Sequence, residues 1–110
     1  MAVTEPDTKQ SEMKTREIFM SEALREAIDE EMQRDPAVFL VGEEVGVWGG
    51  AYAVSAGLLE KWGPDRIVDT PIAEAAIAGL GIGAALTGSR PIAEFMYSDF
   101  MGIAMDQIVN

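Results

Sequence analysis

The sequence predicts an α/β domain built on a parallel sheet that is sandwiched between helices. Stretches whose apolar residues recur at helical spacing alternate along the chain with short, continuously apolar stretches. This alternation is typical of parallel strands joined by helical connections. The apolar run at 38–41 is bounded by turn residues and has no polar side, as expected for a strand buried on both faces.

The first part of the chain divides into a tail and a helix. Residues 1–14 lack apolar periodicity, so we expect a mobile tail there and a folded part at 15–110. The helix is expected at about 22–34, with Ser21 as its N-cap and Asp35 followed by Pro36 at its end. Its apolar stripe consists of Leu24, Ala27, Ile28 and Met32.

The central part predicts two strands and a second helix. The strand at 38–41 leads into a glycine-rich loop at 42–50, and the helix is expected at 51–62. A Gly-Pro-Asp turn follows, and Ile67 and Val68 form a short strand.

A third helix is expected to follow that strand, with Thr70 as its N-cap and Pro71 at the first helical position. No charged residue occurs at 75–89, so we expect this helix to be buried all round. Ala75, Gly79 and Gly83 are four residues apart and share one face. Glycine costs about 1 kcal/mol relative to alanine inside a helix, which favours close approach of another backbone to this face.

The last part predicts a strand at 92–96 and a final helix that Ser98 or Asp99 caps and that continues to Asn110. Three groups of residues then follow strands: Glu43 with Glu44, Glu74, and the segment 97–100. Because ligands bind outside the carboxyl ends of parallel strands, we expect these groups to share one edge and to form a site.

Composition excludes several kinds of chemistry. The chain has no cysteine and no histidine, which removes disulfides, thiolate metal sites and the commonest general base. The net charge of −11 argues against nucleic acid and anionic membrane surfaces as partners. Residues 1–11 are polar and unlike a secretory signal, and no stretch is suited to span a membrane. The lack of cysteine fits a reducing setting, and we expect a cytoplasmic one.

Charge is distributed unevenly. Residues 70–110 contain only five charged side chains, namely Glu74, Arg90, Glu94, Asp99 and Asp106. Such a segment cannot be mostly solvent-exposed in a small monomer. We therefore expect either a fragment of a longer chain or an obligate partner subunit.

Each candidate site residue has a structural and a functional interpretation. Glu74 is either a helix-start acid, stabilised by about 0.3–1 kcal/mol through the helix dipole, or a buried carboxylate that binds a ligand nitrogen. Glu43 and Glu44 fit a solvated loop better than a cation site, and no metal ligand set is expected. Phe95, Met96, Tyr97 and Phe100 are either core residues at a strand–helix junction or an aromatic stacking platform. The glycines at 79–83 lie inside a helix and do not form a dinucleotide-binding loop.

Six stretches occur together and in order: FLVGEEV at 39–45, GGAY at 49–52, GL at 57–58, RIVDTPIAE at 66–74, GSRPIAE at 88–94 and MDQIVN at 105–110. Together they resemble the E1 β subunits of thiamine-diphosphate-dependent 2-oxo acid dehydrogenases, which include the pyruvate, branched-chain and acetoin enzymes. The resemblance covers only the first part of a family chain. It implies a truncated pyrimidine-binding domain of the thiamine-diphosphate-binding fold, without the family's C-terminal domain or its catalytic histidine.

The resemblance implies roles for particular residues. Glu74 matches the glutamate that hydrogen-bonds the pyrimidine N1′ and favours the imino tautomer, so that the 4′-nitrogen can take the proton from thiazolium C2. Phe100 matches an aromatic ring against the pyrimidine, and Ile72 and Met96 match residues that line the same pocket. Glu43 matches an acid of the polar proton tunnel that links the family's two active sites.

The resemblance also implies partners. An E1 α subunit would hold the diphosphate and Mg²⁺ in an α₂β₂ heterotetramer, and a lipoyl-bearing E2 would receive the acyl group. The substrate would be a 2-oxo acid or acetoin, and the stretches at 46–52 and 69–76 look closer to acetoin-type or bacterial pyruvate-type chains than to branched-chain ones. This chain alone is expected to be inactive. The alternatives are a non-catalytic acidic domain that docks a partner through its glycine-faced helix, and a truncated product with no independent role.

Overall fold

The computed structural model describes residues 15–110, and the tail expected at 1–14 lies outside the described residues. In chain order the elements are α1 (Met20–Arg34), β1 (Val38–Glu43), α2 (Leu58–Trp62), β2 (Ile67–Thr70), α3 (Glu74–Leu86), β3 (Arg90–Glu94), the short 3₁₀ helix η1 (Ser98–Phe100) and α4 (Met101–Val109). This order confirms the predicted alternation of helices and strands.

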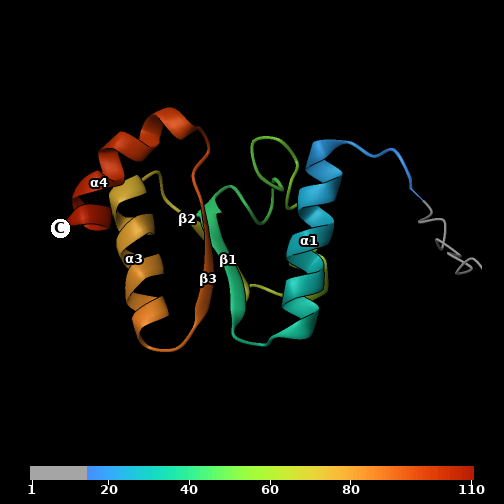
Figure 1. Ribbon diagram of the computed structural model, residues 1–110, viewed down its shortest axis with the longest axis horizontal. Helices are drawn as coiled ribbons and strands as arrows, with labels where there is room; N and C mark the ends of the chain where they lie inside the picture. The colour runs from blue at the N-terminus through green and yellow to red at the C-terminus, as the bar shows by residue number, and fades with distance from the viewer. Residues whose placement is uncertain (1–14) are drawn as a thin grey trace, which may run out of the picture.

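The three strands form one parallel sheet in the order β2-β1-β3. The central strand β1 therefore pairs with both of the others, with Glu43 opposite Thr70 on β2 and Gly42 opposite Glu94 on β3. Figure 1 shows α1 on one side of the sheet and α3 with α4 on the other. The predicted α/β sandwich is confirmed.

Two apolar layers fill the space between the sheet and its helices. On the α1 side, the cluster of buried residues consists of Met32, Val38, Leu40, Val45, Leu58 and Ile67. Side chains alternate along a strand, so Val41 points to the opposite side, where Ile77 and Ala78 of α3 and Ala104 of α4 are buried. Both faces of β1 are thus covered, which explains its continuous apolar run.

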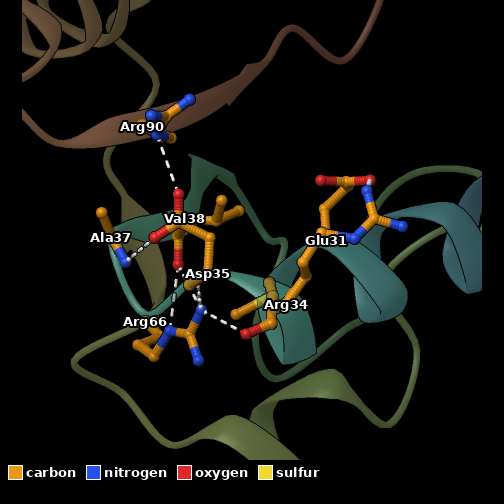
Figure 2. A network of polar contacts seen from close by, with 8 residues as sticks. Glu31, Arg34, Asp35, Ala37, Val38, Arg66 and Arg90 are labelled. Atoms are coloured by element: carbon orange, nitrogen blue, oxygen red, sulfur yellow. Dashed lines mark hydrogen bonds and ion pairs between the residues drawn. The ribbon is translucent and has the colours of Figure 1, made fainter.

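Arg66, just before β2, forms hydrogen bonds with the segment that connects α1 to β1. Its guanidinium group donates hydrogen bonds to the carbonyl oxygens of Met32, Asp35 and Val38 at 2.7–2.9 Å (Figure 2). The Asp35 carboxylate accepts a hydrogen bond from the Ala37 N–H at 2.8 Å and forms an ion pair with Arg90 at 2.8 Å. The amino ends of all three strands are therefore linked at one end of the sheet.

The helix starts differ from the predictions. Helix α1 begins two residues earlier than predicted, at Met20, with Phe19 as its N-cap in place of Ser21. The Glu22 carboxylate accepts a hydrogen bond from the Phe19 N–H at 3.0 Å, so an acid of the first turn caps this end. Only Leu58–Trp62 of the helix expected at 51–62 forms. Gly50, Ala53 and Gly57 have positive φ angles, which a right-handed helix does not allow.

The third helix begins at Glu74 and not at Pro71. Thr70 is the last residue of β2, and its hydroxyl donates to the Pro71 carbonyl at 2.9 Å instead of capping the helix. The expected all-round burial is also wrong for this chain, because Leu80, Ile82 and Leu86 are 40–84% exposed.

The last two elements are shifted relative to the predictions. Strand β3 starts two residues earlier than predicted, at Arg90, and ends at Glu94. Ser98 and Asp99 lie in η1, and Phe100 takes the N-cap position of α4. None of the helices within residues 15–110 has the length and apolar content needed to cross a bilayer.

Candidate functional site

The carboxyl ends of the strands bring the predicted groups to one edge of the sheet. Glu43 ends β1, Thr70 ends β2 and Glu94 ends β3, and the parallel register aligns them within one or two residues. The segment 71–73 connects β2 to α3 at this edge, and the segment 95–97 leaves β3 there. The loop at 44–57, which we call the β1–α2 loop, begins at the same edge.

Glu43 and Glu74 form a buried pair of acids. Glu74 is the first residue of α3 and is 7% exposed, and Glu43 is 5% exposed. The Oε1 atom of Glu43 is buried and has no hydrogen-bond partner among the described residues. A buried acceptor without a partner is rare in folded proteins and points to a ligand, a water molecule or a proton on that oxygen.

Burial changes the acidity of two carboxyl groups at this edge. Burial raises the pKa of Glu43, the negative charge of the neighbouring Glu74 raises it further, and a hydrogen bond with the Ala73 backbone opposes the change. Burial also raises the pKa of Glu94. Glu94 pairs with Gly42 in the register, so its side chain lies on the opposite face of the sheet from that of Glu43, and only Glu43 and Glu74 form a pair.

Three aromatic rings form a second group at the edge. The Tyr52 and Tyr97 rings pack edge to face with centroids 5.9 Å apart, and Tyr97 and Phe100 do the same at 5.8 Å. Phe100 is 37% exposed, so part of its ring remains open to a ligand. The interpretation of Phe100 as a pure core residue is therefore incomplete. Tyr52 was missed as a member of this group because it belongs to a loop that the sequence assigned to a helix.

Ile72 and Met96 lie at the same edge of the sheet. Ile72 lies between β2 and α3 with its side chain 82% exposed, and Met96 is partly buried just after β3. An apolar hollow of about 230 Å³ lies between the end of β2 and α3, lined by Thr70, Pro71, Ala73, Ala76, Ile77 and Leu80. It lies at the start of α3, and Ala73, the residue before Glu74, contributes to its lining.

The sequence also missed Asp69, whose carboxylate accepts hydrogen bonds from the Gly46 N–H at 2.6 Å and the Val47 N–H at 3.3 Å. The only signal for it was an acid at the end of a strand next to a glycine-rich loop. Nowhere within 15–110 do three acidic side chains gather as a metal ion would need.

A parallel sheet with helices on both faces defines an α/β domain, and its carboxyl edge, which carries the buried acid pair and the aromatic rings, is where such domains commonly bind ligands. Residues 16–110 match the family described as "Transketolase, pyrimidine binding domain", and the chain belongs to this family. The family resemblance and the fold expected from it are thereby confirmed.

Individual relatives are similar to this chain over most of its length. The rice protein "Pyruvate dehydrogenase E1 component subunit beta-1, mitochondrial" is 56% identical over 95 residues, which cover 86% of this chain and 25% of the rice protein. The Dictyostelium discoideum mitochondrial subunit beta is 51% identical over 96 residues, covering 87% of this chain and 27% of that protein. The Rickettsia bellii "Pyruvate dehydrogenase E1 component subunit beta" is 56% identical over 94 residues, which cover 86% of this chain and 29% of that protein. The chain thus spans about a quarter of the length of these relatives.

The comparison corrects the expected localisation. The rice and Dictyostelium relatives are named as mitochondrial proteins, which contradicts the cytoplasmic setting, although the Rickettsia relative is bacterial. Composition was a poor guide here, because a lack of cysteine concerns redox chemistry and does not specify a compartment.

Proposed function

We propose that this chain is the pyrimidine-binding part of an E1 β subunit of a thiamine-diphosphate-dependent 2-oxo acid dehydrogenase. The observation that carries the proposal is the burial of the Glu74 carboxylate at the start of α3, on the carboxyl edge of the sheet. The similarity to pyruvate dehydrogenase E1 β subunits supports it. When bound, thiamine diphosphate supplies the electron sink for breaking the bond next to a keto carbon.

The donors and acceptors at this edge fit an aminopyrimidine ring. A ring N–H needs an acceptor, and a carboxylate shielded from water is a strong one. Glu74 would take this role at the pyrimidine N1′ and hold the proton on that nitrogen. The unpartnered Oε1 of Glu43 is a second acceptor nearby and would relay a proton. The open side of Phe100 suits the flat face of the ring, and Ile72 and Met96 would complete the apolar wall.

The rest of the cofactor would be held by a partner. The diphosphate binds together with Mg²⁺, which proteins hold through one or two carboxylates and the phosphate oxygens. An E1 α subunit in an α₂β₂ assembly would supply that half of the site, and it would also cover apolar side chains such as Leu86 and Ile103, which are 84% and 59% exposed. The acyl product would pass to a lipoyl-bearing E2. The substrate would be pyruvate, a branched-chain 2-oxo acid or acetoin.

Cofactor binding tests the proposal. The complete polypeptide would be co-expressed with the α subunit, and thiamine diphosphate binding with Mg²⁺ would be measured by calorimetry for the wild type, Glu74→Gln and Glu44→Gln. Glu44 is the exposed neighbour of Glu43 and serves as the control. We expect stoichiometric binding in the wild type and control, and a parallel turnover assay of the assembled protein should show at least a hundredfold loss with Glu74→Gln. An assembled wild type that does not bind the cofactor would refute the proposal.

One observation favours a second candidate, an acidic domain that docks a partner through α3 without catalysis. A Cβ added at Gly83 would meet no atom within 4 Å, so this part of the glycine face is open in the chain. Gly83→Leu would then abolish assembly, and Glu74→Gln would change nothing because no turnover exists to lose. Turnover by the assembled wild type excludes this candidate.

A further inference from the structure

The β1–α2 loop connects the ends of all three strands. It starts directly after Glu43, and its residue Val45 is completely buried in the apolar layer on the α1 side. Within the loop, the Gly50 N–H donates to the Glu44 carbonyl at 2.7 Å, and the buried Ser55 hydroxyl donates to the Val45 carbonyl at 2.6 Å. The loop is thus a folded unit with its own hydrogen bonds.

The backbone of this loop is held in an unfavourable conformation. Five of its residues have positive φ angles, and two of these, Glu44 (57°) and Ala53 (56°), are not glycine. Side-chain-bearing residues adopt this region rarely, so contacts with the rest of the fold must hold the loop in place.

Asp69 on β2 provides such a contact. Its two carboxylate oxygens accept hydrogen bonds from the consecutive N–H groups of Gly46 and Val47, at 2.6 and 3.3 Å. The approach is close enough that a Cβ on Gly46 would lie 2.6 Å from the Asp69 Oδ2 atom. Only glycine therefore fits at position 46 while Asp69 holds the loop.

The far side of the loop contacts the segment that follows β3. The Tyr52 ring packs on Tyr97, and Tyr97 packs on Phe100, both edge to face. Gly50 lies beside the Glu94 carboxylate, where an added Cβ would be 3.0 Å from Oε1. A contact at Asp69 on β2 thereby reaches, through the loop, the aromatic ring at the start of α4.

We propose that Asp69 is a positioning residue of the cofactor site: by fixing Gly46 and Val47 it sets the β1–α2 loop, whose Tyr52 holds Tyr97 and so orients the ring of Phe100. The proposal rests on the proposed function, because it takes Phe100 as a ring that contacts the pyrimidine. Asp69 itself touches neither cofactor nor substrate. Its effect should appear in cofactor affinity, with smaller changes in overall stability.

The test uses the complete polypeptide assembled with the α subunit. Asp69→Ala removes both acceptors, and Asp69→Asn keeps one oxygen that can accept from Gly46. Asp65→Ala removes an exposed carboxylate from the turn before β2 and is the matched control. Amide hydrogen exchange of the peptide containing Gly46 and Val47 reports the contact, and calorimetry with thiamine diphosphate and Mg²⁺ reports the site.

We expect Asp69→Ala to speed exchange in this peptide and to raise the dissociation constant for thiamine diphosphate at least tenfold. Asp69→Asn should show smaller changes than Asp69→Ala in both the exchange rate and the dissociation constant. Asp65→Ala should match the wild type. Gly46→Ala should resemble Asp69→Ala, and the double variant should be no worse than either single one, because each breaks the same contact.

A further variant tests the proposal even if Asp69→Ala does not fold. Tyr52→Leu changes a ring that is 64% exposed and leaves the hydrogen bonds of Asp69 in place. It should raise the dissociation constant while exchange at Gly46 and Val47 stays at the wild-type rate.

Three results would overturn the proposal, and they distinguish the positioning role from the proposed function. Faster exchange in Asp69→Ala with unchanged cofactor affinity, or unchanged affinity in Tyr52→Leu, would refute the positioning role and leave the proposed function intact. An assembled wild type that does not bind thiamine diphosphate, with the exchange difference still present, would instead refute the proposed function on which the positioning role rests.

Discussion

The carboxyl groups of Glu43 and Glu74 are buried next to each other, although they come from the end of a strand and the start of a helix that are separated by 30 residues of sequence. Burial raises the pKa of Glu43, and the charge of Glu74 adds to this effect. A neighbouring pair of acids shielded from water is costly when both are ionised. The protein therefore bears a stability cost at this edge that a protonated Glu43 or a bound ligand would relieve.

This cost predicts a pH-dependent effect of Glu43→Gln. The fold raises the pKa of Glu43 above its ordinary value of 4.5. At pH values between 4.5 and the raised pKa, the folded protein therefore binds more protons than the unfolded chain. The free energy of unfolding of the wild type should then fall as the pH rises through this range. Glu43→Gln, which cannot ionise, should gain stability relative to the wild type with rising pH.

Thermal unfolding measured from pH 4 to pH 8 checks this. Glu44→Gln, at an exposed position, is the control and should show no such trend. A constant difference between Glu43→Gln and the wild type across this range would contradict the assignment.

The ring of Phe100 predicts a graded effect on cofactor affinity. Phe100→Leu removes the aromatic face and should weaken thiamine diphosphate binding about two- to tenfold, equivalent to about 0.5–1.5 kcal/mol. Phe100→Tyr keeps the ring and should bind nearly as tightly as the wild type. Calorimetry on the assembled protein measures both, and equal affinities of Leu and Tyr variants would exclude ring contact.

The arginines of Figure 2 predict contrasting stabilities. Arg66→Ala leaves the carbonyl groups of Met32, Asp35 and Val38 without their donor and should lower the free energy of unfolding by about 2–4 kcal/mol. Arg34→Ala removes only an exposed ion pair with Glu31 and should cost less than about 1 kcal/mol. Denaturant titration distinguishes the two, and similar losses for both would disprove the central role of Arg66.

Gly42 predicts a steric effect within the sheet. A Cβ at this position would lie 2.8 Å from the carbonyl oxygen of Glu94 and 2.9 Å from Cγ1 of Val45. Gly42→Ala should therefore lower the free energy of unfolding by about 1–3 kcal/mol. Gly102→Ala, where no atom lies within 4 Å of the added Cβ, should be neutral or stabilising by up to about 1 kcal/mol. A melting temperature of Gly42→Ala equal to that of the wild type would contradict the crowding.

The sequence predicted the elements that depend on long-range burial better than those that depend on local caps. The run at 38–41 gave the central strand because both of its faces are covered, and the alternation of elements gave the parallel sheet. The helix starts were wrong at Ser21, Thr70 and Asp99, because side chains able to cap a helix were used in other ways. Thr70, for example, completes β2 opposite Glu43.

The position of a site residue could be predicted from the sequence only where the neighbouring strand and helix determine it. The position of Glu74 followed from the strand and helix around it, and the structure adds that it is buried beside Glu43. Asp69 and Tyr52 could not be found from spacing, because their partners lie 23 and 45 residues away in sequence, at Gly46 and Tyr97. The role of Phe100 is a prediction that Phe100→Leu and Phe100→Tyr test, and the roles of Ile72 and Met96 are predictions as well.

The order β2-β1-β3 also determines how the domain can assemble as it is synthesised. Strand β1 emerges first, but the partner for one of its edges, β3, is translated only after about fifty further residues, so a central and very apolar strand stays half-paired during that interval. Pairings between distant segments form slowly, and an open edge of this kind invites association with other chains. Helix α1, which is synthesised just before β1, carries five acidic side chains and two arginines, and this net negative charge on the growing chain would slow such association.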